Sequence, residues 1–184
     1  MTGLDDEELL RRMASGDEEA FAVLYRRRQG AVYRFALEMS GSTGVAEEVT
    51  QEVFLALIRG DGRYDPSRGP LASWLFGVAR NQVLRFVERD SRYERVEDEA
   101  LEREEPADGP LEDLTRGETL RSVRQAVLAL PARYREAVVL CDLQEMSYDD
   151  AARALDCAVG TVRSRLHRGR ALLAEKLRSL RCGV

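Results

Sequence analysis

The residues best suited to chemistry lie near the C-terminal end, where basic side chains are concentrated. Residues 161–181 contain seven basic residues and a single acid, Glu175. If this segment is helical, its core-facing residues are Val162, Leu166 and Leu173. Its outward-facing residues are then Ser164, His167 and Arg168, flanked by Arg163 and Arg165. Guanidinium groups bind phosphates and base edges, and serine and histidine make single hydrogen bonds, so this side of the helix is predicted to bind nucleic acid.

Simpler explanations of this basic segment stay open at this point. Arg170, Lys176 and Arg178 lie further along the helix and are expected to meet phosphates or solvent. A solvated face on an ordinary bundle helix would have the same composition. The excess of arginine, 27 residues against a single lysine, is also what a GC-rich genome would encode.

The rest of the chain offers little for catalysis. It has no GxxxxGK[ST], GxGxxG or HExxH motif, and its only histidine cannot pair with a second one at a metal site. Cys141, Cys157 and Cys182 are widely spaced and form no CxxC pair, which argues against a disulfide framework and a zinc site. We therefore expect free thiols, no metal, no cofactor and no catalytic residue.

Acidic side chains dominate a central segment. Residues 90–118 carry 12 acidic and 4 basic side chains, although the whole chain of 184 residues has a net charge of only −5. Within it, residues 102–110 have two prolines and too little apolar surface to offset the entropy of ordering. The composition predicts a flexible linker at 93–115 between domains at 1–92 and 116–184, and a solvated tether is the simplest role for it.

The chain has no signal for membrane insertion. No apolar run approaches the roughly 18 residues needed to cross a bilayer. The segment from Met1 to Glu8 is acidic, where a signal peptide needs a basic and then an apolar stretch. The sequence therefore predicts a cytoplasmic protein.

Every persistent pattern outside the linker has a period near 3.6 residues, which predicts an all-α fold. In the first domain, helices are expected at about 5–15, 17–40 and 44–59, and Pro70 opens a further one. The core-facing residues expected on the second helix are Phe21, Leu24, Tyr25, Val32, Phe35, Ala36 and Met39. Those expected on the Pro70 helix are Leu71, Trp74, Leu75 and Val78. The third helix carries Glu48, Gln51 and Glu52 on one polar stripe.

The second domain is predicted to contain a helix-turn-helix. Thr115–Glu118 and Ser147–Asp150 each match a capping box, and a further helix is expected at about 132–143. The residues from Asp156 to Gly160 form a turn, after which the basic helix starts near Thr161. Asp156 must end the preceding helix, which a short polar side chain can do in the left-handed conformation.

Two blocks of the sequence resemble the ECF (extracytoplasmic function) sigma factors of bacterial RNA polymerase. Residues 130–140, 146–155 and 159–170 are similar to the fourth region of that family. Residues 46–57, Tyr64-Asp-Pro and residues 73–81 are similar to its second region. The two blocks stand in the family's order, with an acidic segment between them.

The resemblance implies a polymerase subunit that recognises promoter DNA and promotes its melting. The residues it implies for the minus-thirty-five element are Thr161, Arg163, Ser164, Arg165, His167 and Arg168. Those it implies for the minus-ten element are Arg63, Tyr64, Asp65, Ser67, Arg68, Arg80, Asn81 and Arg85. The loop at 63–69 would hold an extruded base, while Trp74 is expected in the core rather than as a wedge.

The resemblance also implies protein partners. Glu48, Gln51 and Glu52 would dock on the clamp helices of the largest polymerase subunit, and acceptor side chains in one stripe suit a partner rich in arginine. The family usually has aspartate at the position of Glu48. The second domain would bind the polymerase flap, the linker would imitate RNA in the active-site cleft, and an anti-sigma factor is a family expectation. A solvated helix face is the alternative explanation of the stripe.

Two other classes of protein share part of this pattern. A helix-turn-helix regulator that does not act as a polymerase subunit leaves residues 1–89 unexplained. An adaptor built from helical hairpins accounts for the helices but not for the basic cluster at 161–181.

Overall fold

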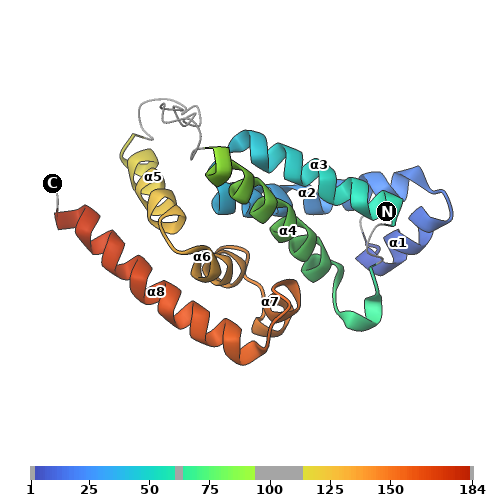
Figure 1. The fold of residues 1–184 in the computed structure, drawn as a ribbon. Helices are drawn as coiled ribbons and strands as arrows, with labels where there is room; N and C mark the ends of the chain where they lie inside the picture. Colours follow the sequence, from blue (N-terminus) through green and yellow to red (C-terminus); the bar gives the residue numbers. More distant parts are fainter. Residues whose placement is uncertain (1–2, 61–63, 94–113, 183–184) are drawn as a thin grey trace.

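The computed structural model describes residues 3–60, 64–93 and 114–182, and every element in these ranges is helical (Figure 1). The N-terminal domain contains α1 (Asp6–Ala14), α2 (Glu18–Ser40), α3 (Thr43–Arg59), the 3-10 turn η1 (Pro66–Arg68) and α4 (Leu71–Tyr93). The C-terminal domain contains α5 (Leu114–Leu128), α6 (Ala132–Val138), the π-helical turn η3 (Val139–Leu143), α7 (Tyr148–Ala154) and α8 (Val159–Cys182). The predicted all-α fold of two helical domains is confirmed, and nearly all of the predicted linker lies outside the described residues. Among the described helices, none has the length and apolar character that crossing a bilayer requires.

Local signals in the sequence account for the helix boundaries of the N-terminal domain. The carboxylate of Asp17 accepts a hydrogen bond from the backbone N–H of Ala20 at 3.1 Å and begins α2. Ser42 Oγ accepts from the N–H of Val45 at 3.3 Å and begins α3. The C-terminal cap of α2 is a glycine with φ 73°, in the left-handed region that this residue adopts without strain.

The C-terminal domain differs from the prediction in three details, although the helical segment expected at 132–143 has those bounds. Helix α5 begins before Thr115, so this residue lies inside the helix and does not cap it. The helix expected at 132–143 changes to π-helical geometry at Val139. Helix α8 begins at Val159, two residues before the predicted start near Thr161.

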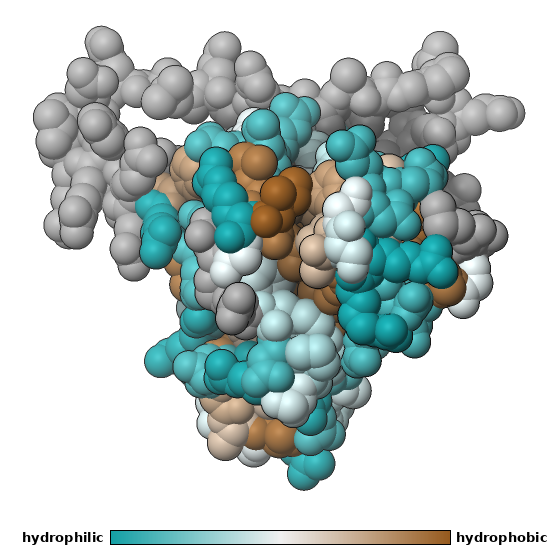
Figure 2. All heavy atoms as spheres, turned by 90° about the vertical axis from the view of Figure 1, so that its right-hand side faces the viewer, coloured by the Kyte–Doolittle hydropathy of each residue, from teal (hydrophilic) through white to brown (hydrophobic). Residues whose placement is uncertain are grey.

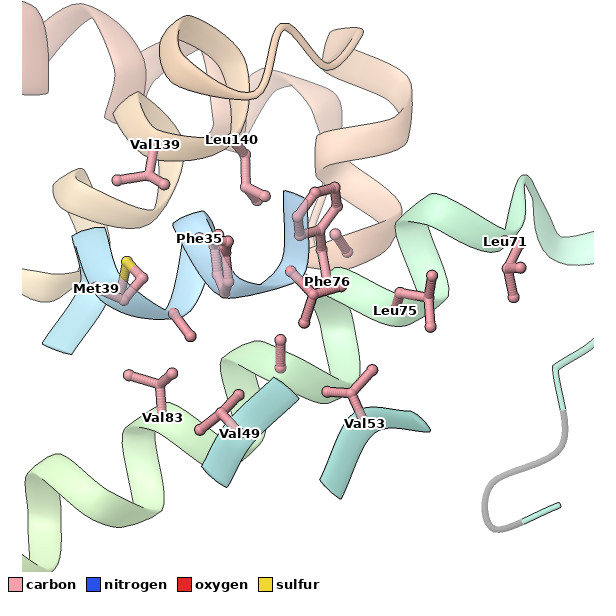
Figure 3. Close-up of a cluster of buried hydrophobic side chains, with 14 of the residues drawn as sticks. Phe35, Met39, Val49, Val53, Leu71, Leu75, Phe76, Val83, Val139 and Leu140 are labelled. Carbon is pink, nitrogen blue, oxygen red and sulfur yellow. The ribbon is translucent and has the colours of Figure 1, made fainter. Parts of the chain in front are cut away.

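One hydrophobic core spans both domains. Phe35 of α2 and Phe76 of α4 contact each other at 5.3 Å between ring centroids. In Figure 3, Val139 and Leu140 of η3 point toward these aromatic rings and toward Met39. All five side chains are buried, so the two domains share apolar contacts that each would otherwise expose to water. The sequence did not predict this shared core.

The domain contact also contains polar interactions. Helix α4 packs against α7, and α2 packs against α5 and η3. The Arg135 guanidinium donates to the carbonyl oxygen of Met39 at the end of α2, at 2.5 Å, and to the carbonyls of Leu128 and Leu130 in its own domain. Arg135 therefore satisfies carbonyl groups at two helix ends that lack intrahelical partners.

Candidate nucleic-acid and protein-binding surfaces

The helix-turn-helix is built as the sequence predicts. Ser147 Oγ accepts a hydrogen bond from the backbone N–H of Asp150 at 3.1 Å, which begins α7. Asp156 has φ 49°, so it ends α7 in the left-handed conformation expected for it. On the core side of α8, Val162 and Leu166 are buried and Leu173 is half-buried. These contacts fix which side of α8 faces solvent.

The outward side of α8 presents most of the predicted nucleic-acid contacts. The exposed residues are Arg163, Ser164, His167 and Arg168, and the half-buried ones are Thr161 and Arg165. Arg165 turns toward the core, where its Nη1 lies 3.9 Å from Oε2 of the buried Glu136. The exposed side chains are accessible from solvent, whereas Arg165 already has a charged partner.

Arg170 is engaged within the C-terminal domain. Its Nη2 and Nε donate to the two carboxylate oxygens of Asp142 in η3, at 2.6 and 3.0 Å. These hydrogen bonds raise the pKa of Arg170, since they stabilise its charged form. A fork-to-fork pair of this kind competes with a phosphate for the same donors. Arg170 was expected to meet phosphate or solvent, and the structure gives it a protein partner.

The predicted base-holding loop is tied together by its own side chains. Tyr64 Oη donates to the carbonyl oxygen of Gly69 at 3.0 Å, and the tyrosine ring packs edge-on against Trp74 at 6.5 Å. Asp65 accepts from Ser67 Oγ at 2.7 Å and from the Ser67 N–H at 2.9 Å. These hydrogen bonds lower the pKa of Asp65. Burial is the main cause that raises the pKa of Tyr64, so it stays a neutral donor.

The remaining predicted minus-ten residues differ in how exposed they are. Arg68, Asn81 and Arg85 are exposed, while Arg63 lies outside the described residues. Arg80 is half-buried, and its Nε lies 2.8 Å from Oε1 of Glu136 in the other domain. Trp74, which was expected in the core, is half-buried.

A cavity of about 950 Å³ is lined by residues of this loop, of α4, of α7 and of the helix-turn-helix turn. Its lining includes Tyr64, Trp74 and Asn81 on one side, and Arg153, Asp156 and Cys157 on the other. Ser73 Oγ is buried in its wall and has no hydrogen-bond partner among the described residues. One side of the predicted minus-ten loop therefore faces the C-terminal domain, while Asp65, Ser67 and Arg68 are exposed to solvent.

The polar stripe on α3 is accessible. Glu48 and Gln51 are exposed and Glu52 is half-buried. Neither glutamate makes an ion pair with another residue that the structure describes. Acceptors held in one line on a rigid helix, with their charge unneutralised, can bind a cationic partner helix.

An aromatic groove of about 700 Å³ lies beside this stripe, between α2 and α3. Its lining includes Phe21, Tyr25, Phe54, Gln51 and Ile58, and the Ile58 side chain is 54% exposed. The sequence placed Phe21 and Tyr25 in the core, but both are only half-buried and pack against Phe54 at the groove wall. Other apolar patches between hydrophilic side chains are visible on the face shown in Figure 2.

Glu136, which was not among the residues predicted from the sequence, is only 2% exposed. A carboxylate at this depth needs cations, and both of its partners are arginines from the predicted DNA-contacting set. The sequence does contain a signal for the burial of Glu136. This residue directly precedes the apolar run Ala137-Val-Val-Leu140, and the residues three and four positions after it face the core, so they lie on the same side of the helix.

Comparison with known proteins places both blocks in one family. Residues 24–93 match Sigma-70 region 2, and residues 120–173 match Sigma-70, region 4. The ECF RNA polymerase sigma factor SigM of Mycobacterium tuberculosis is 36% identical over 188 residues, which cover 97% of this chain and 88% of the relative. SigE of Mycolicibacterium smegmatis is 37% identical over 172 residues, covering 89% of this chain but only 65% of that relative.

Solved structures agree with the sequence relatives. CnrH, in complex with the cytosolic domain of CnrY, superimposes with a TM-score of 0.71 at 28% identity, covering 95% of this chain and 97% of CnrH. The sigma factor RpoE of Bartonella quintana, in complex with the anti-sigma factor NepR, gives a TM-score of 0.65 at 28% identity, covering 82% and 91% of the two chains. The helix order, the helix-turn-helix and these similarities together show that the chain belongs to the ECF RNA polymerase sigma factor family.

Proposed function

We propose that this protein is a dissociable, non-catalytic subunit of RNA polymerase that works in the cytoplasm. It binds the core enzyme, recognises promoter DNA and promotes melting of the duplex. The observation that carries this proposal is the pairing of two accessible surfaces in one chain, the basic face of α8 and the acceptor stripe of α3. A regulator that never binds polymerase has no use for the second surface, so this alternative is not favoured.

The C-terminal domain, at 116–184, reads the minus-thirty-five element. Exposed Arg163 and Arg168 are suited to contact guanine or phosphate, with Ser164 and His167 adding single hydrogen bonds. Thr161 and Arg165 complete this set of residues. All of them lie in the N-terminal half of α8, the part of a recognition helix that reaches base edges.

The N-terminal domain, at 1–92, reads the minus-ten element. The Tyr64 ring offers a stacking surface for an extruded base, in a loop that Asp65 and Ser67 hold in shape. The basic or amide groups available to contact the backbone and the upstream edge are Arg63, Arg68, Arg80, Asn81 and Arg85.

The core enzyme docks on the stripe of Glu48, Gln51 and Glu52 and on the aromatic groove beside it. Carboxylates supply orientation and long-range attraction to arginines on the clamp helices, while the groove supplies apolar area. The flap is the partner of the C-terminal domain. The acidic segment at 93–115 follows the RNA path, where its charge resembles that of a transcript.

An anti-sigma factor is the remaining proposed partner. RpoE and CnrH, both similar in structure to this chain, are described in complexes with NepR and with the cytosolic domain of CnrY. Co-purification from the native host is the direct way to identify such a protein.

Transcription from a defined template tests the proposed function. Purified core polymerase is mixed with the protein, separated from free protein by gel filtration, and then assayed for run-off transcription on native-host genomic fragments. We expect co-elution with core and start sites that core alone does not use. If the protein does not bind core, or if core starts at the same sites without it, the proposed function is wrong.

A further inference from the structure

An exposed arginine of the basic helix α8 is held by an acid from another element. Arg170 donates from Nη2 and Nε to the two carboxylate oxygens of Asp142 in η3, at 2.6 and 3.0 Å. The two side chains are 54% and 28% exposed, so the pair lies at the surface. The Tyr148 hydroxyl forms a further hydrogen bond with Arg170. Three hydrogen bonds within the protein therefore hold this guanidinium.

Arg170 is aligned with residues that are proposed to read DNA. It lies seven positions after Arg163, which is nearly two helical turns, so both residues are on the same side of α8 with His167 between them. All three are exposed. The rise per residue places Arg170 about 10 Å further along the helix axis than Arg163. Because base edges are read by the N-terminal half of a recognition helix, the neighbour expected at Arg170 is the DNA backbone.

Packing on both sides fixes the position of the pair. Gly169 directly precedes Arg170, and a Cβ built on it would stand 2.8 Å from Cγ2 of Val138 and 3.2 Å from the carbonyl oxygen of Tyr134. Helix α8 therefore contacts α6 just before Arg170, with no room for a side chain there. On the other side, the N–H of Gln144 donates to the carbonyl of Val139, five residues earlier, and closes the π-helical turn that carries Asp142. Formation of the pair thus has to order only the two side chains.

We propose that Asp142 limits the affinity of this protein for DNA by keeping Arg170 away from the phosphate backbone. A carboxylate that accepts from two donors of one guanidinium competes with a phosphate for the same fork of donors. It also places a negative charge beside the expected path of the duplex. This inference rests on the proposed binding of α8 to DNA.

The proposed effect of Asp142 is independent of base sequence. Phosphate contacts supply essentially all of the affinity for random DNA, and each contact adds to the salt dependence of binding. Removing one contact should weaken binding to promoter and non-promoter DNA alike. Asp142 would therefore set the general affinity for DNA, whereas exposed Arg163 and Arg168 set the preference for particular bases.

An Asp142→Asn variant tests this proposal by releasing Arg170. Holoenzyme is assembled from native-host core polymerase, and filter binding is measured from 50 to 200 mM salt. The two probes are a duplex from a start site used in the run-off assay and a scrambled duplex of the same length and composition. We expect the plot of log affinity against log salt to steepen by about 0.9, the increment for one phosphate contact. Both duplexes should bind about fivefold more tightly at 50 mM salt.

The same substitution in an Arg170→Gln background is the matched control. Loss of the Asp142 charge has the same long-range effect in both backgrounds, but only the first one releases an arginine. The salt dependence should therefore change little in the double variant. Arg170→Lys provides a second test that leaves Asp142 in place. An ammonium group keeps the charge but cannot form the two parallel hydrogen bonds, so the salt dependence should steepen here as well, by less than for Asp142→Asn.

The outcomes separate this inference from the proposed function. The inference is wrong if Asp142→Asn leaves the salt dependence unchanged, if it weakens duplex binding, or if its effect persists in full with Arg170→Gln. The proposed function is wrong if the unmodified protein gives core polymerase no preference for the start-site duplex over the scrambled one. Circular dichroism checks that each variant is folded, which is expected because an exposed ion pair contributes little to stability. If Asp142→Asn unfolds, Arg170→Lys decides, and an unchanged salt dependence there contradicts the inference.

Discussion

The two domains use their charged side chains in opposite ways. The N-terminal domain exposes acceptors at Glu48 and Gln51 and holds a predicted DNA-contacting cation, Arg80, against the other domain. The C-terminal domain exposes cations such as Arg168 and buries an acid, Glu136. The exposed groups indicate different partners, a cationic protein surface and a polyanionic duplex, while the two hidden charges satisfy each other.

The pairing of these two hidden charges also contributes to the contact between the domains. A buried carboxylate without a cation would be strongly destabilising, and the Arg80 guanidinium supplies one at 2.8 Å. Apolar contacts between Phe35, Phe76 and Leu140 surround the same boundary. The interface therefore combines hydrophobic burial with a charge pair that depends on the domains staying in contact.

The largest expected effect comes from breaking the shared core. Leu140→Ala removes a fully buried side chain where the domains meet and should lower the free energy of unfolding by about 2–5 kcal/mol. Leu143→Ala, at a side chain that is 44% exposed, is the control and should change it little. Urea unfolding followed by circular dichroism measures both. A cost for Leu140→Ala as small as the control's would mean that the domains do not share a core in solution.

The second largest effect is expected at the exposed acids of the N-terminal domain. Reversing Glu48 and Glu52 to arginine should weaken core binding at least about tenfold, because attraction to the clamp helices becomes repulsion. The change is measured by competition for core against the unmodified protein. Glu175→Arg, an exposed reversal in the C-terminal domain, is the control. Unchanged core affinity in the double variant would place the docking surface elsewhere.

The exposed cations of the C-terminal domain should show a graded response. Arg168→Ala should weaken holoenzyme binding to promoter DNA by about 1–3 kcal/mol while core binding is unchanged. Arg170→Ala should cost less, because Asp142 already occupies its donors. Filter binding at one fixed salt concentration compares the two. Equal losses would show that the Asp142 pair opens on DNA, and a loss of core binding would indicate misfolding.

The smallest effect concerns a second acid near the domain contact. Desolvation raises the pKa of Glu38 above 4.5, and Arg124, 3.5 Å away, only partly counters it. The folded protein therefore binds this proton more tightly than the unfolded chain does. The contribution of protonated Glu38 to the free energy of unfolding is present in full below about pH 4.5. It is lost as the pH rises through the pKa that Glu38 has in the folded protein.

The Glu38→Gln variant has no ionisable group at this position. Its melting temperature at pH 7 should therefore be higher than that of the unmodified protein. The difference should shrink toward pH 4.5, which thermal unfolding at several pH values measures. A variant less stable than the unmodified protein at pH 7 would mean that the ion pair with Arg124 outweighs desolvation.

Much of the recognition surface was predictable because it depends on local rules. Ser147 and Asp156 set the ends of α7, and helical periodicity then decides that Arg168 faces solvent while Val162 faces the core. The stripe at Glu48 and Gln51 follows in the same way. The prediction was incomplete where neighbours from other helices matter, as at Phe21, which packs against the core but also lines a groove.

The sequence by itself determined the helices, the helix-turn-helix and the sides on which charged residues gather, because hydrogen bonds within four residues and a 3.6-residue period control them. Only the tertiary structure decided that Arg80 and Arg165 meet at Glu136, and that Val139 and Leu140 complete the core of the other domain. These contacts join residues more than fifty positions apart, or different faces of separate helices. No local periodicity encodes them, since they arise from how whole surfaces of the domains fit together.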